Sequence, residues 1–100
     1  MAFFVMKDCV YILFSKKLNR FYTGQTSNFE QRMEFHKSAE NTKFTGKADD
    51  WQLFLKINCQ SKKQALAIET HIKKMKSSTY IKNLIKYPEI IDKLKVKYNC

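Results

Sequence analysis

The segment from Cys9 to Gly24 constrains the fold most strongly, because two apolar runs in it are separated by one polar break. The runs 9–14 and 20–24 are rich in β-branched and aromatic residues, and residues 15–19 between them are mostly polar. Such runs on either side of a short polar segment are typical of a β-hairpin. We therefore predict two antiparallel strands joined by a loop at residues 16–19.

The position of this loop determines which residues of the hairpin pair. With the loop at 16–19, Leu13 lies opposite Tyr22, and Tyr11 lies opposite Gly24. Side chains alternate along a strand, so Tyr11 and Tyr22 share a face and become diagonal neighbours. The pairing predicts two phenols on one face of the hairpin, with Gly24 leaving the space over Tyr11 open.

A helix that carries an arginine and a histidine is expected directly after the hairpin. Ser27 or Asn28 can cap it, and a carboxylate or amide side chain follows about three positions later, as in a capping box. We expect this helix to run from about residue 29 to residue 37. Arg32 and His36 are spaced i, i+4, so they lie on one side of the helix, at the border of its apolar stripe.

The remaining chain predicts one more strand and three helices. After a polar loop at 38–50, whose Lys43 and Lys47 could reach a phosphate or simply be solvated, we expect a strand at 51–57 and helices at 62–76, 80–87 and 89–97. Ser61 is suited to cap the first of these helices, and Pro88 to separate the last two. The predicted fold class is α/β, in the α+β sense: a small three-stranded antiparallel or mixed sheet flanked by helices, in the order β-β-α-β-α-α-α.

The helix at 62–76 has an apolar stripe with a carboxylate beside it. The stripe consists of Ala65, Ile68, Ile72 and Met75. Glu69 lies at its edge, whereas His71 projects away from the stripe and is expected at the surface.

Length and charge predict one basic domain. One hundred residues with an apolar share of 44% suit a single folded unit. We place its core at about 9–86 and a helical tail at 87–100. The net charge of +10 is uneven, because residues 1–55 carry 8 basic and 6 acidic side chains and residues 56–100 carry 11 and 3. Such a field attracts polyanions, with nucleic acid the leading candidate and an anionic membrane the lesser one.

The cysteines and the apolar start of the chain narrow the setting. Cys9, Cys59 and Cys100 are far apart and form no C-x-x-C pair, so neither a disulfide scaffold nor a zinc site is favoured. Reduced thiols predict a cytoplasmic location. The apolar run Ala2–Met6 is too short for a signal peptide or a membrane span.

The motif order resembles the GIY-YIG nucleases. It consists of V-Y-I around Tyr11, Y-T-G around Tyr22 eleven residues later, and R-x-x-x-H from Arg32 to His36. The helix A-L-A-I-E-T-H-I-K-K-M-K resembles the metal-ligand helix of that family through Glu69. The likeness is closest to the N-terminal nuclease domain of the excision-repair nuclease excinuclease C, in a small stand-alone form. Val10 stands where the family name has Gly, and Thr23 stands where it has Ile.

The resemblance implies a role for each motif residue. Glu69 would hold Mg²⁺ or Mn²⁺, and Arg32 would hold the scissile phosphate, since a guanidinium suits two phosphate oxygens. His36 would donate to or orient the phosphate or the attacking water. Tyr11 and Tyr22 would position water and phosphate. The alternatives are an i,i+4 ion pair of Glu69 with a lysine one turn later, a surface His36, and two tyrosines that only pack across the hairpin.

Six further residues are candidates for nucleic-acid contact. They are Lys17, Arg20, Gly24, Lys73, Lys74 and Asn83. The basic residues could equally be solvated, and Gly24 could mark a β-bulge at a strand end. Asn83 is included only because some family members carry an asparagine after the metal helix.

Together these features predict a metal-dependent DNA endonuclease, possibly acting in DNA repair or processing, with RNA left open as a substrate. Only about 14 residues follow residue 86, so we expect targeting to come from DNA structure, the lysine-rich helices or a partner protein. The main alternative is a non-catalytic nucleic-acid-binding module with the same fold. A protein-interaction or membrane-surface module would be supported by charge alone.

Overall fold

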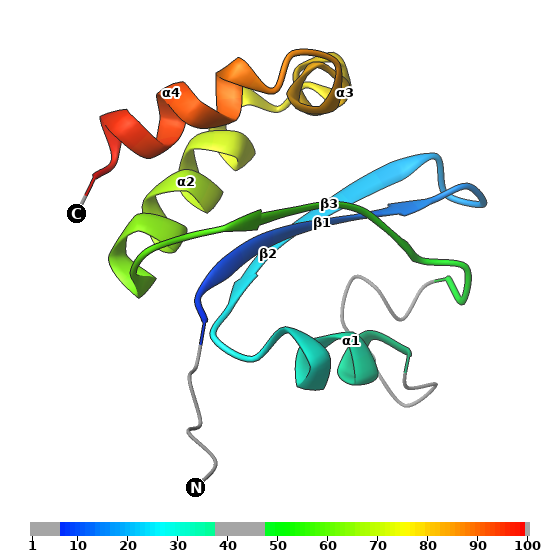
Figure 1. The fold of residues 1–100 in the computed structure, drawn as a ribbon. Coiled ribbons are helices and arrows are strands. Elements are labelled where there is room, and N and C mark those ends of the chain that lie inside the picture. The colour runs from blue at the N-terminus through cyan, green and yellow to red at the C-terminus, as the bar shows by residue number, and fades with distance from the viewer. Residues whose placement is uncertain (1–6, 38–47, 100) are drawn as a thin grey trace, which may run out of the picture.

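The computed structural model describes residues 7–37 and 48–99, with the side chains of 35–37 left out. The elements are β1 Cys9–Ser15, β2 Arg20–Thr26, α1 Phe29–Lys37, β3 Gln52–Asn58, α2 Lys62–Met75, α3 Ser78–Lys86 and α4 Glu89–Lys97 (Figure 1). This order matches the predicted β-β-α-β-α-α-α. The predicted loop residues Lys43 and Lys47 lie outside the described residues.

The three strands form one antiparallel sheet in the order β2-β1-β3. The predicted hairpin register is confirmed, because Tyr11 pairs with Gly24 and Leu13 pairs with Tyr22. The loop turns at Asn19, whose φ of 50° is left-handed and whose N–H donates to the Lys16 carbonyl at 3.2 Å. Asparagine tolerates this conformation better than most residues do.

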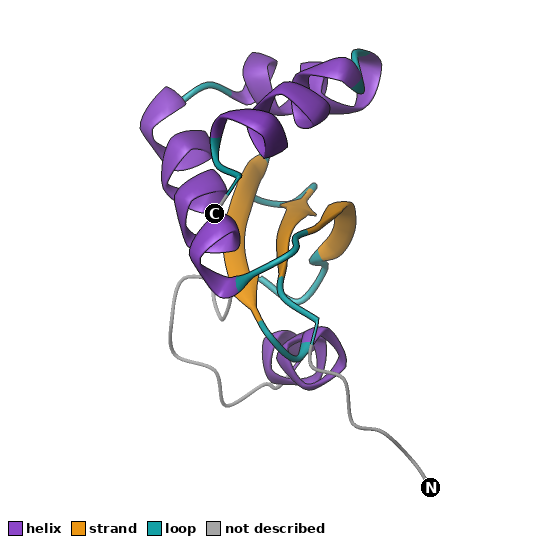
Figure 2. Ribbon diagram, turned by 60° about the vertical axis from the view of Figure 1, so that its left-hand side comes forward, coloured by secondary structure: helices purple, strands orange, loops and turns teal. Residues whose placement is uncertain are grey.

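Helices cover both faces of this sheet, as Figures 1 and 2 show, with α1 on one face and α2, α3 and α4 on the other. Alternation along β1 divides its residues between the faces. Val10 and Ile12 are fully buried in the main core, which also contains Ile57, Ala65, Ile68, Ile72, Ile81, Leu84 and Leu94. Tyr11 points to the opposite face, where its ring meets that of Phe29 at the start of α1. The sheet therefore separates a large aliphatic core from a smaller aromatic layer that contains the motif tyrosine.

Side chains cap three of the helices at their first turn. The Gln31 N–H donates to Asn28 Oδ1 at 3.2 Å, so Asn28 is the cap that the sequence left open between two candidates. Ser61 caps α2 as predicted. Ser77 accepts the Tyr80 N–H at 3.1 Å and starts α3 two residues earlier than predicted. A hydroxyl at this position satisfies one of the four N–H groups that a helix start leaves without partners.

The end of α2 differs from the expected apolar stripe. Lys76 adopts the left-handed conformation, with φ of 47°, and ends the helix one residue earlier than predicted. Met75 is 45% exposed, so its predicted place in the core stripe is wrong. The turn at Lys76 redirects the chain into α3 before Met75 can reach the core.

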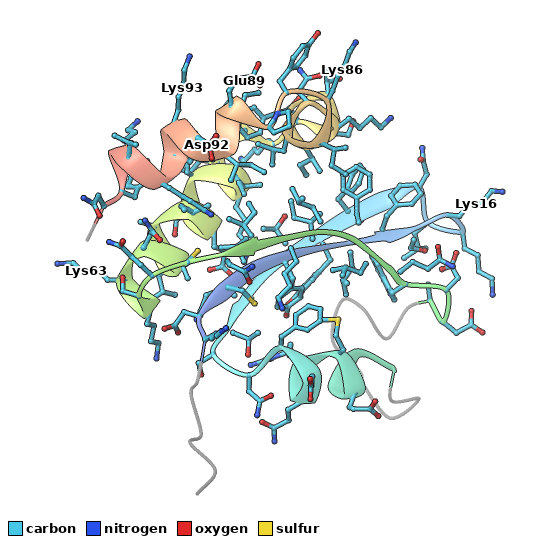
Figure 3. All side chains as sticks on the ribbon, viewed as in Figure 1. Lys16, Lys63, Lys86, Glu89, Asp92 and Lys93 are labelled. Atoms are coloured by element: carbon cyan, nitrogen blue, oxygen red, sulfur yellow. The ribbon has the colours of Figure 1, made fainter. Side chains whose placement is uncertain are left out.

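The described helices, α1 to α4, include none that is both long and apolar enough to cross a bilayer. Charged side chains of α2, α3 and α4 point outward, as Lys63, Lys86 and Lys93 do in Figure 3.

Candidate active site

Tyr11 is at the centre of the candidate site, although its side chain is almost fully enclosed. It is only 1% exposed, and its ring centroid lies 6.3 Å from that of Tyr22 and 6.4 Å from that of Phe29. Tyr22 in turn contacts the Trp51 ring edge-on at 6.4 Å. The two motif tyrosines therefore lie together on the α1 face, as the register predicted.

Several groups act on the Tyr11 phenol. Burial is the main cause that raises its pKa above the ordinary value of 10, and Tyr22 raises it further by its proximity and by a hydrogen bond. Glu69 also raises the pKa, whereas the positive charge of Arg32 lowers it. All four groups must therefore lie within electrostatic reach of one another. The fold brings together Tyr11, Tyr22, Arg32 and Glu69 from β1, β2, α1 and α2.

Glu69 is half-buried, with 17% of its side chain exposed. Its Oε2 lies 3.5 Å from Lys73 Nζ, so the ion pair considered as an alternative is present. The Lys73 side chain is 54% exposed, and such exposed pairs are typically worth less than about 1 kcal/mol. The pair therefore leaves Glu69 available for other partners.

The two helix residues of the R-x-x-x-H motif are described to different extents. Arg32 is half-buried on α1 and lies close enough to lower the Tyr11 pKa. The backbone of His36 lies one turn further along α1, but its side chain is outside the described residues. The proposed role of His36 stays a prediction.

Gly24 has a close-packing role that the sequence did not reveal. A Cβ at this position would lie 2.5 Å from Cζ and 3.0 Å from Cε2 of Tyr11. The Tyr11 ring thus fills the space beside Gly24, which the hairpin pattern predicted to be open. The register is regular at this pair and no bulge occurs there, so the glycine is needed for the close approach of the ring.

Two acidic residues before β3 hold the hairpin loop and engage Lys17. Lys17 Nζ lies 2.6 Å from Asp49 Oδ1, and the Lys17 N–H donates to Asp50 Oδ2 at 2.9 Å. Asp50 Oδ1 also accepts the Ser15 hydroxyl at 2.6 Å. Hydrogen bonding and charge raise the pKa of Lys17 and lower that of Asp49. Lys17, predicted to contact nucleic acid, is therefore already paired within the protein.

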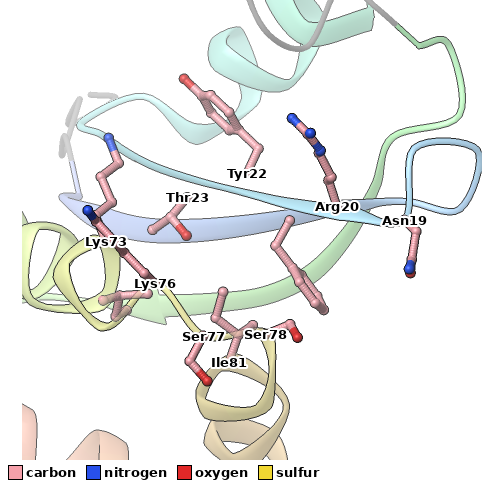
Figure 4. Close-up of a pocket in the computed structure, with 11 residues that line it drawn as sticks. Asn19, Arg20, Tyr22, Thr23, Lys73, Lys76, Ser77, Ser78 and Ile81 are labelled. Carbon is pink, nitrogen blue, oxygen red and sulfur yellow. The ribbon is translucent and has the colours of Figure 1, made fainter.

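A groove of about 1010 Å³ runs between the outer edge of β2 and the junction of α2 with α3 (Figure 4). We call it the β2 groove. Its lining residues are Asn19, Arg20, Phe21, Tyr22, Thr23, Ile72, Lys73, Lys76, Ser77, Ser78 and Ile81. Two of these residues touch the candidate site, because Tyr22 hydrogen-bonds Tyr11 and Lys73 pairs with Glu69.

The β2 groove divides the predicted nucleic-acid residues. Arg20 and Lys73 line it, whereas Lys74 lines a different depression beside His71 and Tyr98. Asn83 is half-buried on α3 and is not among the lining residues of the groove. Sequence reasoning missed Lys76, Ser77 and Ser78 as possible site residues. The only signal was the polar run that follows the last lysines of α2.

His71 also differs from expectation. It was expected at the surface, but it is half-buried, with its Nδ1 3.0 Å from the Tyr98 hydroxyl and its ring beside those of Tyr80 and Tyr98. Burial, Lys97 and Lys74 lower the pKa of His71. This cluster joins α2 to the end of α4 and lies outside the candidate site.

The residues around Tyr11 suit a hard divalent cation held by a single carboxylate. Mg²⁺ commonly binds through one or two carboxylates, retains several waters and takes substrate phosphate as a further ligand. Glu69 provides one half-buried carboxylate. In the described ranges 7–37 and 48–99 no group of three or more His, Cys, Asp or Glu residues could hold a metal, so a closed protein cage of zinc type is not formed there.

Comparison with known proteins identifies the family. The family model described as the GIY-YIG catalytic domain matches residues 7–83. The chain therefore belongs to the GIY-YIG family, whose members share a nuclease-type domain. No curated protein and no solved structure matches the chain in the corresponding searches.

Proposed function

We propose that this protein is a metal-dependent endonuclease that hydrolyses phosphodiester bonds in DNA. The observation that carries the proposal is the convergence of Tyr22, Arg32 and Glu69 on the Tyr11 phenol. These groups come from four different elements, and packing alone does not require an arginine, a glutamate and two phenols at one place. The motif pattern and the family match over residues 7–83 support the same chemistry.

Arg32 is suited to bind the scissile phosphate. A guanidinium donates two parallel hydrogen bonds to phosphate oxygens and keeps its charge at any physiological pH. The same charge would stabilise the extra negative charge that the phosphoryl group develops during attack. His36, one turn away on α1, would add a second donor.

The two phenols act in this proposal as hydrogen-bond donors that position the phosphate and the attacking water. Burial raises the pKa of Tyr11 above 10, so the phenol stays protonated at neutral pH and is a poor base there. Because Tyr11 and Tyr22 are hydrogen-bonded to each other, a substrate oxygen can replace one phenol as the partner of the other.

Glu69 would hold the cation, Mg²⁺ or Mn²⁺. When bound, the cation supplies Lewis-acid stabilisation of the phosphate and of the leaving oxygen. The carboxylate must exchange the Lys73 ammonium for the cation, which costs little because that pair is largely exposed.

The test is cleavage of DNA by the purified protein. Labelled duplex, nicked, flapped and branched DNA would be incubated with Mg²⁺, with Mn²⁺ or with a chelator. We expect cleavage only with a cation, and loss of that cleavage in Glu69→Ala. Binding that survives the chelator, with no cleavage under any condition, would instead identify the alternative, a non-catalytic nucleic-acid-binding module.

Two further points of the proposal concern setting and targeting. The thiols of Cys9 and Cys59 are free, which suits a reducing compartment such as the cytoplasm, and an endonuclease there could serve DNA repair or processing. A partner protein could direct such a small nuclease to its sites.

A further inference from the structure

We infer that the β2 groove holds an unpaired DNA strand that continues from the phosphate at the candidate active site. This inference rests on the proposed function, because it concerns the substrate of the same site. It would give the enzyme a preference for duplexes that carry a single-stranded extension.

The charge of the groove fits a nucleic-acid strand. Arg20, Lys73 and Lys76 line it, and Asp and Glu are absent from its lining among the residues that the structure describes. Ser77 and Ser78 add hydroxyl groups at the start of α3. A groove lined by cations and hydroxyls suits phosphate oxygens along a backbone.

The inner side of the groove favours unpaired nucleotides over a duplex. Phe21, Ile72 and Ile81 form it, and Ile72 and Ile81 belong to the main core. In a duplex the faces of the bases are stacked on one another, so only sugars and phosphates would meet this apolar surface. An unpaired base can place its face against such side chains, a contact that is sequence-tolerant.

The size and position of the groove agree with this occupant. Its volume of about 1010 Å³ is at the upper end of the range of about 300–1,000 Å³ typical of sites for drug-sized ligands. Tyr22 and Lys73 line the groove and also contact Tyr11 and Glu69, respectively. Figure 4 shows Lys73 and Lys76 on one side and Arg20 and Tyr22 on β2. A strand in the groove would therefore run directly from the scissile phosphate.

Ser78 and Thr79 offer a matched pair of variants. Ser78 lines the groove and Thr79 does not, although both are exposed and lie in the first turn of α3. A glutamate is favourable at either position, because negative charge near a helix N-terminus stabilises the helix. Ser78→Glu therefore places a negative charge in the groove, and Thr79→Glu places the same charge beside it.

The experiment measures binding in chelator, so that no cleavage occurs. Fluorescence anisotropy would compare a blunt duplex with the same duplex carrying an unpaired extension of about ten nucleotides, which spans a typical single-strand binding site. We expect the wild-type protein to bind the extended duplex roughly tenfold more tightly. Ser78→Glu should remove most of this preference, and Thr79→Glu should retain it. Lys76→Asn gives a second route, since asparagine tolerates the left-handed backbone at that position.

Equal wild-type affinity for the two duplexes would overturn the inference, as would equal losses in Ser78→Glu and Thr79→Glu. These outcomes are independent of the proposed function. Metal-dependent cleavage without a preference for the extension would leave the nuclease intact and remove the strand from the groove. A preference without cleavage would retain the groove and remove the nuclease.

Discussion

Gly24 on β2 lies directly against the phenol ring of Tyr11 on β1, and there is no room between them for a methyl group. The reason is the register of the hairpin, which pairs these two residues across the strands. Gly24 does not have positive φ, so its backbone conformation does not demand glycine. The ring alone excludes a side chain, which makes the second motif glycine a determinant of where Tyr11 sits.

Gly24→Ala is therefore expected to destabilise the fold by about 1–3 kcal/mol, the usual cost of overpacking. The new Cβ would lie 2.5 Å from Cζ of Tyr11, so the ring or the strand has to shift. The measurement is urea unfolding of the variant and the wild type. Because a smaller side chain removes the clash, adding Gly24→Ala to Tyr11→Leu should cost much less than adding it to the wild type. An equal cost in both backgrounds would show that the ring is not the cause.

The sequence predicted the hairpin and the pairing of its residues because both depend on local signals. Apolar alternation on either side of a polar loop determines the register, and the register places Tyr11 opposite Gly24. It did not predict that the Tyr11 ring would occupy the space beside Gly24, because the alternation specifies a face and leaves the packing of the ring undetermined.

Features that depend on tertiary packing were missed. The sequence placed Met75 in the core, but the left-handed turn at Lys76 leaves it exposed. It left His71 at the surface, because the partner Tyr98 is 27 residues away and no local pattern joins them. The β2 groove exists only because α3 starts directly after that turn, so its lining could not be read from spacing along the chain.

Glu69→Ala should abolish cation-dependent cleavage and change the free energy of unfolding by less than about 1 kcal/mol. The variant loses the carboxylate that would hold the cation, and otherwise only an ion pair whose lysine is 54% exposed. Cleavage assays beside urea unfolding measure both effects. Glu89→Ala on α4 is the control, since Glu89 is exposed and points away from the site (Figure 3). Wild-type turnover in Glu69→Ala would exclude Glu69 from the mechanism, and loss of folding would indicate a structural role.

DNA affinity should fall steeply with salt, and Lys76 should contribute more to that dependence than Lys74. Each phosphate that a basic side chain neutralises contributes about −0.9 to the slope of log affinity against log salt. Lys76 lines the β2 groove, whereas Lys74 lines a separate depression. Lys76→Ala is therefore expected to flatten the slope by about 0.9, and Lys74→Ala to leave it nearly unchanged. Anisotropy titrations over a salt series provide the slopes, and equal slopes for the two variants would argue against a binding role specific to the groove.

The stability of the protein should decrease as the pH falls below about 6.5, the ordinary pKa of histidine. Burial is the main cause that lowers the pKa of His71, with Lys97 and Lys74 adding to it. A group whose pKa is lower in the folded state contributes stability that is present above its unfolded pKa and is lost as the pH falls through the folded pKa. Urea unfolding at a series of pH values should show this loss in the wild type.

His71→Phe keeps a ring between Tyr80 and Tyr98 and removes the titrating group, so it should show a smaller loss over the same pH range. Tyr98→Phe deletes only the hydroxyl that lies 3.0 Å from Nδ1 and serves as the control for the hydrogen bond. If His71→Phe loses as much stability as the wild type, carboxylates elsewhere are responsible for the acid sensitivity.

The last prediction concerns the hydrogen-bonded pair of motif tyrosines. Tyr11→Phe and Tyr22→Phe each keep the ring and remove one hydroxyl, so each should lower kcat by about 10²-fold, as loss of one preorganised donor does, with little change in DNA affinity. Arg32→Ala should also lower kcat, because it removes the charge nearest the phenols. Single-turnover cleavage with saturating protein separates the rate from binding.

Because the two hydroxyls are hydrogen-bonded to each other, they should act as one unit. The double variant with both phenylalanines should therefore lose less than the product of the two single losses. Leu13→Ile, on the same face of β1 and remote from catalysis in this proposal, controls for general disturbance of the strand. Strictly multiplicative losses would mean that the phenols act separately, and near-wild-type rates for Tyr11→Phe and Arg32→Ala would overturn the assignment of the active site.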